Sequence, residues 1–192
     1  KAQGEAVRSL WTQVPNSYNS GIGKFTYSTY EFKNTYQASL QKSLNAATAT
    51  EAGTIIDYIR GNMTTRGIAN PTYQYFLADI FHSDIIYVGK PLLWKNLYDT
   101  SACDKAHAST DSDCYKYFYN TYEARQQAVY VGTNDGVIHQ INADPTTGTG
   151  GGNELFGFVP DEVLPKLKNI AINNYFTYTA DGRMTATDIY SP

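Results

Sequence analysis

Histidine and aspartate are the residues of this sequence that could carry acid–base or metal chemistry, and their spacing argues against both. His82, His107 and His139 show no HxH or HExxH pattern, the spacing that brings two imidazoles to one metal ion. His139 lies in an alternating run, which favours a hydrogen-bonded polar residue of a strand, and His107 lies in a polar loop. We therefore expect no catalytic residue, no metal ligand and no enzymatic activity.

One polar loop holds both cysteines, Cys103 and Cys114. Their short separation favours a local disulfide over two unrelated buried thiols, and a disulfide implies an oxidising compartment. Four acidic residues crowd the same loop and could recruit a cation, but their irregular spacing favours a solvated loop. They are Asp99, Asp104, Asp111 and Asp113.

Two short motifs lack the residue that their chemistry would require. The glycine run at 148–152 has no Lys-Ser or Lys-Thr after it, as a phosphate-binding loop would, and indicates a flexible tip. Residues 60–62 are Arg-Gly-Asn rather than the integrin-binding Arg-Gly-Asp, and Asn62 offers no carboxylate to a receptor metal. We expect neither motif to bind these ligands.

The composition is that of a folded domain with an unusual excess of tyrosine. Hydrophobic residues make up 42% and charged residues 17%, and there are 17 Tyr against 2 Trp. Tyrosine suits half-buried strands as well as interfaces. The net charge of −3 comes without a basic patch, so nucleic acid is not an expected partner. No run approaches the ~20 apolar residues that span a bilayer.

The first four residues are polar, with no initiator methionine and no signal peptide, so the chain is expected to begin after processing or inside a longer polypeptide. Residues 7–12 predict a short strand, ended by Pro15 and the turn-forming cluster 16–23.

The next segment predicts helices. Apolar residues recur at helical spacing between residues 36 and 60, and the alanine- and threonine-rich stretch 46–52 predicts a break into two helices. Gly61 stands where a left-handed C-cap is expected. Residues 1–72 are thus predicted as a first strand plus a helical insertion.

From residue 73 onward the sequence becomes strand-like. Residues 85–89, 128–132 and 137–141 are β-rich runs bounded by turn residues. Between the last two lie Asn134, Asp135 and Gly136, residue types that tolerate positive φ and mark a hairpin. A structural turn is the favoured interpretation over a ligand site.

A repeat joins these runs. Tyr-Val-Gly at 87–89 recurs at 130–132, and Asp135-Gly136 recurs as Asp181-Gly182, each pair followed by a strand-like run that ends in Asp. A period of roughly 40–50 residues built from short hairpins is typical of β-propeller blades. The predicted fold class is therefore mainly β, part of a propeller with a helical insertion near the N-terminus.

The length is too short for a whole propeller. A ring needs roughly four to eight blades, and residues 73–192 supply two to three at most. We expect 129–141 and 175–190 to form the blade core, with 99–114 and 145–152 as projecting loops. An open ring leaves unpaired strand edges, so the chain is predicted to be a fragment or to be completed by another chain.

Four segments, in the same order, resemble those of the PilC/PilY-type type IV pilus tip proteins. Residues 129–143 and 154–160 are similar to the family's signature hairpin and to the segment that follows it. Upstream, residues 78–91 are similar to its His-Ser…Val-Gly-x-Pro motif, and 55–61 to its Arg-Gly motif; residues 7–12 resemble the strand before them.

The resemblance implies a quinoprotein-like propeller at the pilus tip, acting in pilus assembly, surface adhesion and twitching motility without catalysis. It implies export through the periplasm to the outer-membrane surface and the pilus tip. The implied partners are minor pilins and the pilus filament, the remainder of the propeller, and a host or abiotic surface.

The sequence departs from the family pattern at three places. Asp84 replaces the usual proline, and Asp144-Pro145 with the loop to Gly152 lengthens a blade turn. Some family members carry a calcium loop of alternating carboxylates, and no such loop occurs in this sequence. We therefore expect no cofactor, and calcium regulation does not carry over.

Two other classes of protein have similar propeller sequence motifs. A quinoprotein dehydrogenase would need a catalytic Asp, a calcium-bridged quinone and repeating tryptophans, whereas Trp11 and Trp94 are not at repeating positions. An outer-membrane assembly scaffold also has repeats with Asp-Gly turns. The His-Ser…Val-Gly-x-Pro and Arg-Gly motifs favour the pilus family over both.

Overall fold

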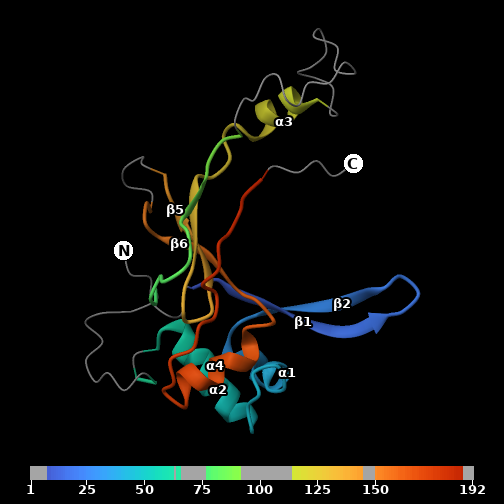
Figure 1. The fold of residues 1–192 in the computed structure, drawn as a ribbon, viewed down its shortest axis with the longest axis vertical. Coiled ribbons are helices and arrows are strands. Elements are labelled where there is room, and N and C mark those ends of the chain that lie inside the picture. The colour runs from blue at the N-terminus through green and yellow to red at the C-terminus, as the bar shows by residue number, and fades with distance from the viewer. Residues whose placement is uncertain (1–7, 63, 66–76, 92–113, 145–149, 188–192) are drawn as a thin grey trace.

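The computed structural model describes residues 8–62, 64–65, 77–91, 114–144 and 150–187, which form one open sheet with short helices at two of its ends (Figure 1). The strands are β1 (Leu10–Asn19), β2 (Lys24–Glu31), β3 (Ile86–Val88), β4 (Ala128–Gly132), β5 (Ile138–Asn142) and β6 (Glu154–Val159). The helices are η2 (Asn34–Tyr36), α1 (Gln37–Leu40), α2 (Ala49–Arg60), α3 (Tyr115–Tyr122) and α4 (Leu164–Ala171).

The six strands lie in the order β2-β1-β6-β5-β4-β3. Strands β3 to β6 form an antiparallel meander, and β1 joins β6 in parallel. The mainly-β expectation is confirmed. The sheet is open, and the described residues form no closed ring of blades. Because β1 pairs with β6, the segments 1–72 and 73–192 contribute to one sheet.

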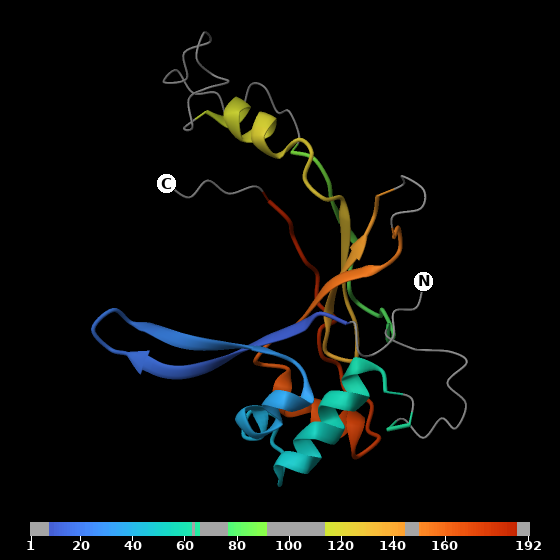
Figure 2. The same cartoon turned by 180° about the vertical axis from the view of Figure 1, so that it is seen from behind.

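The N-terminal strand is longer than predicted and has a partner that was missed. Strand β1 continues through Pro15 to Asn19 and pairs with β2, and the two project as an arm (Figures 1 and 2). Only residues 10–12 of β1 also pair with β6, so Pro15 lies where the strand is an edge, beside a register shift between Pro15 and Ser17. An edge strand tolerates proline because no neighbour needs its missing N–H.

The predicted pair of helices is confirmed, but the break lies earlier than expected. Residues 41–48 separate α1 from α2, and Ala49 already belongs to α2. The reason is an N-cap: Thr48 Oγ1 accepts the N–H of Glu51 at 3.1 Å. The C-cap prediction is confirmed, since Gly61 has φ 90°.

The main core lies between the sheet and the helices α1, α2 and α4. Leu10 of β1 and Val159 of β6 pack there with Ile55, Ile56 and Ile59 of α2. Leu164 and Leu167 of α4 belong to the same core. The three helices gather at one end of the sheet in both views, while α3 lies at the other (Figures 1 and 2).

Two predictions for the C-terminal half were wrong. Residues 174–187 form neither strand nor helix, although 175–190 was expected as blade core; residues 188–190 lie outside the described ranges. Residues 115–122 and 164–171, in the region predicted as strand-like, are the helices α3 and α4. Helix α3 buries none of its side chains, so no packing into a core in the described part of the chain explains why its aromatic residues depart from their strand preference.

Candidate functional site

The turn at residues 133–136 joins β4 to β5 and packs on α4. The Thr133 N–H donates to Val137 O at 3.0 Å, and the Gly136 N–H donates to Thr133 O at 3.0 Å. Gly136 has φ 86°, and a Cβ there would stand 2.6 Å from Val163 Cγ1 and 2.7 Å from Leu167 Cδ2. Both the backbone conformation and the close approach of α4 therefore require glycine.

Beneath this turn runs a fully buried polar network. His139 of β5 is 0% exposed; its Nδ1 lies 2.6 Å from Glu154 Oε1 and its Nε2 lies 3.0 Å from Thr133 Oγ1. The Thr133 hydroxyl also bonds Asp135 Oδ1, which lies 3.8 Å from His139 Nε2. The interpretation of His139 as a hydrogen-bonded strand residue is confirmed.

Two arginines extend the network to the first segment of the chain. Arg8 forms a bidentate pair with Glu154, at 2.7 Å from Nε and 2.9 Å from Nη2, and its Nη1 donates to Ile59 O at 3.0 Å. Arg60 donates to Phe32 O and to Arg8 O, each at 3.0 Å. Because Arg60 is buried, its side chain serves packing of α2 against the sheet rather than an external partner.

The charges of the network stabilise one another. Burial alone would raise the pKa of Glu154, but hydrogen bonds from Arg8 and His139 outweigh it and lower that pKa to about 2. Burial likewise opposes charge on His139 and Asp135, yet the attraction between their opposite charges raises the pKa of His139 and lowers that of Asp135. The network thus favours ionised carboxylates beside a protonated imidazole.

A histidine between two carboxylates could transfer protons if a substrate reached it. The members of the polar network are at most 5% exposed: Arg8, Thr133, Asp135, His139 and Glu154. A general base must come within hydrogen-bonding reach of the group that it deprotonates. The arrangement therefore locks β5, β6, the turn and α2 together, with His139 and Glu154 closed to solvent.

A small cavity adjoins the turn on its outer side. It has a volume of about 130 Å³ and is lined by Asp79, Asn134, Asp135, Tyr175 and Phe176 among others. One wall is fixed by the Asn134 N–H, which donates to Asp79 O at 3.0 Å. The Asn134 side-chain amide and Asp135 Oδ2 are buried without a hydrogen-bond partner in the described part of the chain.

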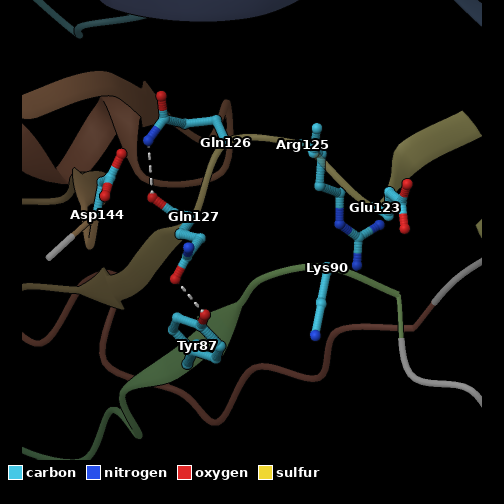
Figure 3. A pocket seen from close by; sticks show the side chains of 8 residues that line it. Tyr87, Lys90, Glu123, Arg125, Gln126, Gln127 and Asp144 are labelled. Carbon is cyan, nitrogen blue, oxygen red and sulfur yellow. Dashed lines mark hydrogen bonds between the residues drawn. The ribbon is translucent and has the colours of Figure 1, made fainter. Parts of the chain in front are cut away.

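A larger hollow of about 360 Å³ lies near α3 (Figure 3). Lys90 and Asp144 approach it from either side of the α3–β4 connection, which contributes Glu123 and Arg125. The Tyr87 hydroxyl donates to Gln127 Oε1 at 2.6 Å beside it. Both signs of charge line this hollow, so its electrostatics select no particular class of ligand.

The second predicted turn has a different setting. Asp181 Oδ2 lies 2.8 Å from His82 Nδ1, and Gly182 has open space within 4 Å of the position that a Cβ would occupy, with no positive φ. The segment that carries them lies against the first turn, because Thr179 Oγ1 donates to Thr133 O at 3.3 Å. No strand begins there in the described residues.

Several predicted positions lie outside the described residues. Cys114, the N-cap residue of α3, is buried, but Cys103 is not described, so their disulfide stays a prediction. His107 and the four aspartates of the cysteine loop also lie outside the described residues. In the described ranges no three His, Cys, Asp or Glu side chains gather as metal ligands would. Among those same residues no helix is long and apolar enough to cross a bilayer.

Sequence reasoning missed the network itself. Arg8 and Glu154 lie far apart in sequence, and nothing local pairs them. A signal existed, since Arg60 and Glu154 stand in segments that resemble family motifs and both are charged residues among apolar ones. Charged residues are almost never fully buried unless they are paired, so such positions predict buried partners.

Curated proteins of the type IV pilus are similar to this chain along most of its length. The chain is 30% identical over 190 residues to the type IV pilus biogenesis factor PilY1 homolog of Xylella fastidiosa strain Temecula1, covering 96% of this chain and 14% of the relative. It is 26% identical over 182 residues to type IV pilus biogenesis factor PilY1 of Pseudomonas aeruginosa strain PAK, covering 92% of this chain and 14% of the relative.

No family profile matches the chain, and no solved structure matches it. The curated relatives nevertheless align with more than nine-tenths of the chain. The chain spans only 14% of the length of these relatives. The chain is similar to one section of the type IV pilus biogenesis factors PilY1.

Proposed function

We propose that the chain is a non-catalytic binding and structural section of a type IV pilus tip protein that acts in pilus assembly, surface adhesion and twitching motility. Its curated relatives are named as type IV pilus biogenesis factors. The buried network supports a non-catalytic role, because its His139 and Glu154 side chains are closed to solvent. We further propose that it needs no cofactor of its own.

The observation that carries this proposal is the open edge at β3. Strand β3 pairs with β4 on one side, and no described strand pairs with its other side. Ile85 and Tyr87 beside this edge are 64% and 59% exposed. An exposed edge with apolar side chains is a template for another strand. The meander β3 to β6 has the four antiparallel strands of a propeller blade, which supports a larger propeller as the source of that strand.

In this proposal the remainder of the propeller, from the same polypeptide or another chain, covers the β3 edge. Minor pilins and the pilus filament lie next to the assembled domain, and a host or abiotic surface is the target of adhesion. The location is extracellular, at the pilus tip or outer-membrane surface, after export through the periplasm. An oxidising location also agrees with the predicted Cys103–Cys114 disulfide.

Hydrogen exchange on the 192-residue chain and on the longer protein that contains it tests the edge. We expect those amides of 85–88 that point away from β4 to exchange quickly in the chain alone and slowly in the longer protein. The amides of β5, which has partners on both sides, serve as the control and should be protected in both. Full protection of residues 85–88 in a monomeric isolated chain would show that the domain is self-sufficient.

Ile85→Lys tests the role in the cell, because a charge at an edge blocks strand addition. We expect fewer surface pili and a smaller twitching zone at unchanged protein level. Ile172→Lys, at the C-cap of α4 and away from both sheet edges, is the matched control. Normal piliation and motility in the Ile85→Lys strain would count against the proposal.

A further inference from the structure

The cavity beside the Asn134–Asp135 turn has a size that limits what it can hold. Its volume is about 130 Å³. Sites for small-molecule ligands have volumes of roughly 300–1,000 Å³, so a sugar ring or a nucleotide does not fit. The space equals that of about four water molecules at roughly 30 Å³ each. It therefore suits a single side chain.

The polar groups of the cavity require a hydrogen-bond donor. Asn134 and Asp135 are 7% and 3% exposed, and Asn134 Oδ1 and Asp135 Oδ2 are both acceptors without a partner among the described residues. Buried polar atoms of this kind are rare in folded proteins and need an explanation. The other carboxylate oxygen of Asp135 is held by Thr133 Oγ1. The second oxygen, Oδ2, is buried and has no hydrogen-bond partner among the described residues.

The charges around the cavity point to a cation. Asp79 and Asp135 are acidic, and none of the described lining residues is Lys, Arg or His. Tyr58, Tyr175 and Phe176 add aromatic rings to the wall. Aromatic faces attract a cation by roughly 0.5–2 kcal/mol, more when water is excluded.

A group of exposed aromatic rings adjoins the cavity through Phe176, which lines it. Tyr175 and Phe176 are 69% and 64% exposed, and Phe81 is 61% exposed. The rings form a continuous group, with the Tyr178 ring 5.0 Å from Phe176 and 5.7 Å from Phe81. Exposed apolar patches of this kind mark interaction sites. Binding hot spots combine such rings with a deep pocket for one anchoring side chain.

We propose that this cavity binds an arginine side chain presented by a protein partner, with the aromatic group of Phe81, Phe176 and Tyr178 contacting the residues that flank it. Arginine fits better than lysine because its planar guanidinium has five donors for the Asn134 and Asp135 oxygens and stacks on aromatic rings. The unpartnered Asn134 Nδ2 donor is then available to a backbone carbonyl of the partner. This site does not depend on the proposed role in the pilus.

Saturation-transfer difference NMR on the 192-residue chain tests the proposal, since it works for weak ligands and in any assembly that the chain forms. The probe is N-acetyl-L-arginine N-methylamide, and its uncharged analogue, N-acetyl-L-citrulline N-methylamide, has nearly the same shape. We expect binding of the arginine probe to be at least about fivefold stronger. Equal binding of the two probes would overturn the proposal.

Two variants locate the binding. Asp79→Asn and Phe176→Ala should each weaken binding of the arginine probe about two- to fivefold. Asp181→Asn and Phe25→Ala are the matched controls, because neither residue lines the cavity and Phe25 is an exposed phenylalanine of β2, and they should leave the probe's binding unchanged. Thermal unfolding verifies that each variant is folded. A preference for arginine that survives both Asp79→Asn and Phe176→Ala would place the binding elsewhere and contradict the proposal.

Discussion

Asp135-Gly136 and Asp181-Gly182 are the same dipeptide in two settings. The first connects β4 and β5, with both residues buried and Gly136 at φ 86° against α4. The second lies in an irregular segment, where Gly182 has open space around it. Each aspartate lies near a histidine, but Asp135 meets His139 inside the protein and Asp181 meets His82 at the surface.

The difference shows what gives such a dipeptide its role. At the first position the paired strands β4 and β5 and the adjoining helix α4 allow a single backbone conformation. The turn is therefore determined by the elements around it. At the second position side-chain contacts hold the segment, including Ser83 Oγ donating to Ala180 O at 3.1 Å. The second segment therefore covers the first turn without joining the sheet. Changes at the first position should cost far more stability than matched changes at the second.

The largest effect is expected from Glu154→Gln. This substitution removes the charge that pairs with Arg8 and leaves a buried cation, which typically costs about 3–5 kcal/mol. Urea unfolding of the 192-residue chain measures it. Glu31→Gln is the control, since the Glu31–Lys33 pair is exposed to solvent and should change stability by less than about 1 kcal/mol. Similar losses in the two variants would show that the network contributes no more than a surface pair.

Acid should destabilise the protein in a defined window. The pKa of Glu154 falls from 4.5 to about 2 on folding, so its contribution is complete above pH 4.5 and is lost as pH falls toward 2. A shift of this size corresponds to about 3 kcal/mol. The lowered pKa of Asp135 acts in the same direction. Unfolding free energies between pH 7 and pH 2 check this.

His139 gives the opposite dependence. Its pKa is raised from 6.5, so its contribution to stability is complete below pH 6.5 and is lost as pH rises through the folded value.

The Glu154→Gln variant tests the acid dependence. Its unfolding free energy should fall less steeply between pH 4.5 and pH 2 than that of the parent chain. An acid profile that is identical in this variant and in the parent would contradict the assignment to Glu154.

Glycine replacement compares the two turns directly. Gly136→Ala combines a left-handed backbone, costing about 1–2 kcal/mol, with a Cβ pressed against Val163 and Leu167, so we expect a loss of about 2–3 kcal/mol. Gly182→Ala should change stability by less than about 0.5 kcal/mol. Thermal unfolding of both variants provides the measurement. Equal effects would mean that the second turn is also constrained.

Local patterns predicted the parts of this fold that local physics controls. Strand 128–132 has the bounds expected from its β-branched run, and Gly61 caps α2 as its position indicated. Strand β2 was missed although Phe25 and Tyr27 alternate with polar residues, because the preceding strand was ended before the turn cluster 16–23 and no element was assigned to residues 24–31. Helix α4 was missed although Leu164 and Leu167 have helical spacing.

The remainder depends on contacts between distant residues. Residues 175–187 have strand-like composition, but a strand exists only where another strand pairs with it. The buried network joins Arg8 to Glu154 across most of the chain, so no window of sequence contains it. Family resemblance located the segments that carry this network without revealing that their charged residues meet.

The smallest effect is expected for the surface histidine–carboxylate pair, measured against the buried one. His82 Nδ1 lies 2.8 Å from Asp181 Oδ2, and His139 Nδ1 lies 2.6 Å from Glu154 Oε1, so the two pairs have nearly the same geometry. The His82 side chain is 60% exposed, whereas that of His139 is 1% exposed. Water replaces the surface interaction when it is lost, and exposed pairs contribute about 0.2–1 kcal/mol.

Double-mutant cycles with His82→Ala and Asp181→Asn, and with His139→Asn and Glu154→Gln, give the two coupling energies. We expect less than about 0.5 kcal/mol for the surface pair and at least about 1.5 kcal/mol for the buried pair. Added salt should reduce the surface coupling further and leave the buried one nearly unchanged, because screening acts on solvated charges. Equal coupling energies would mean that burial does not distinguish the two turns, and the contrast between them would be lost.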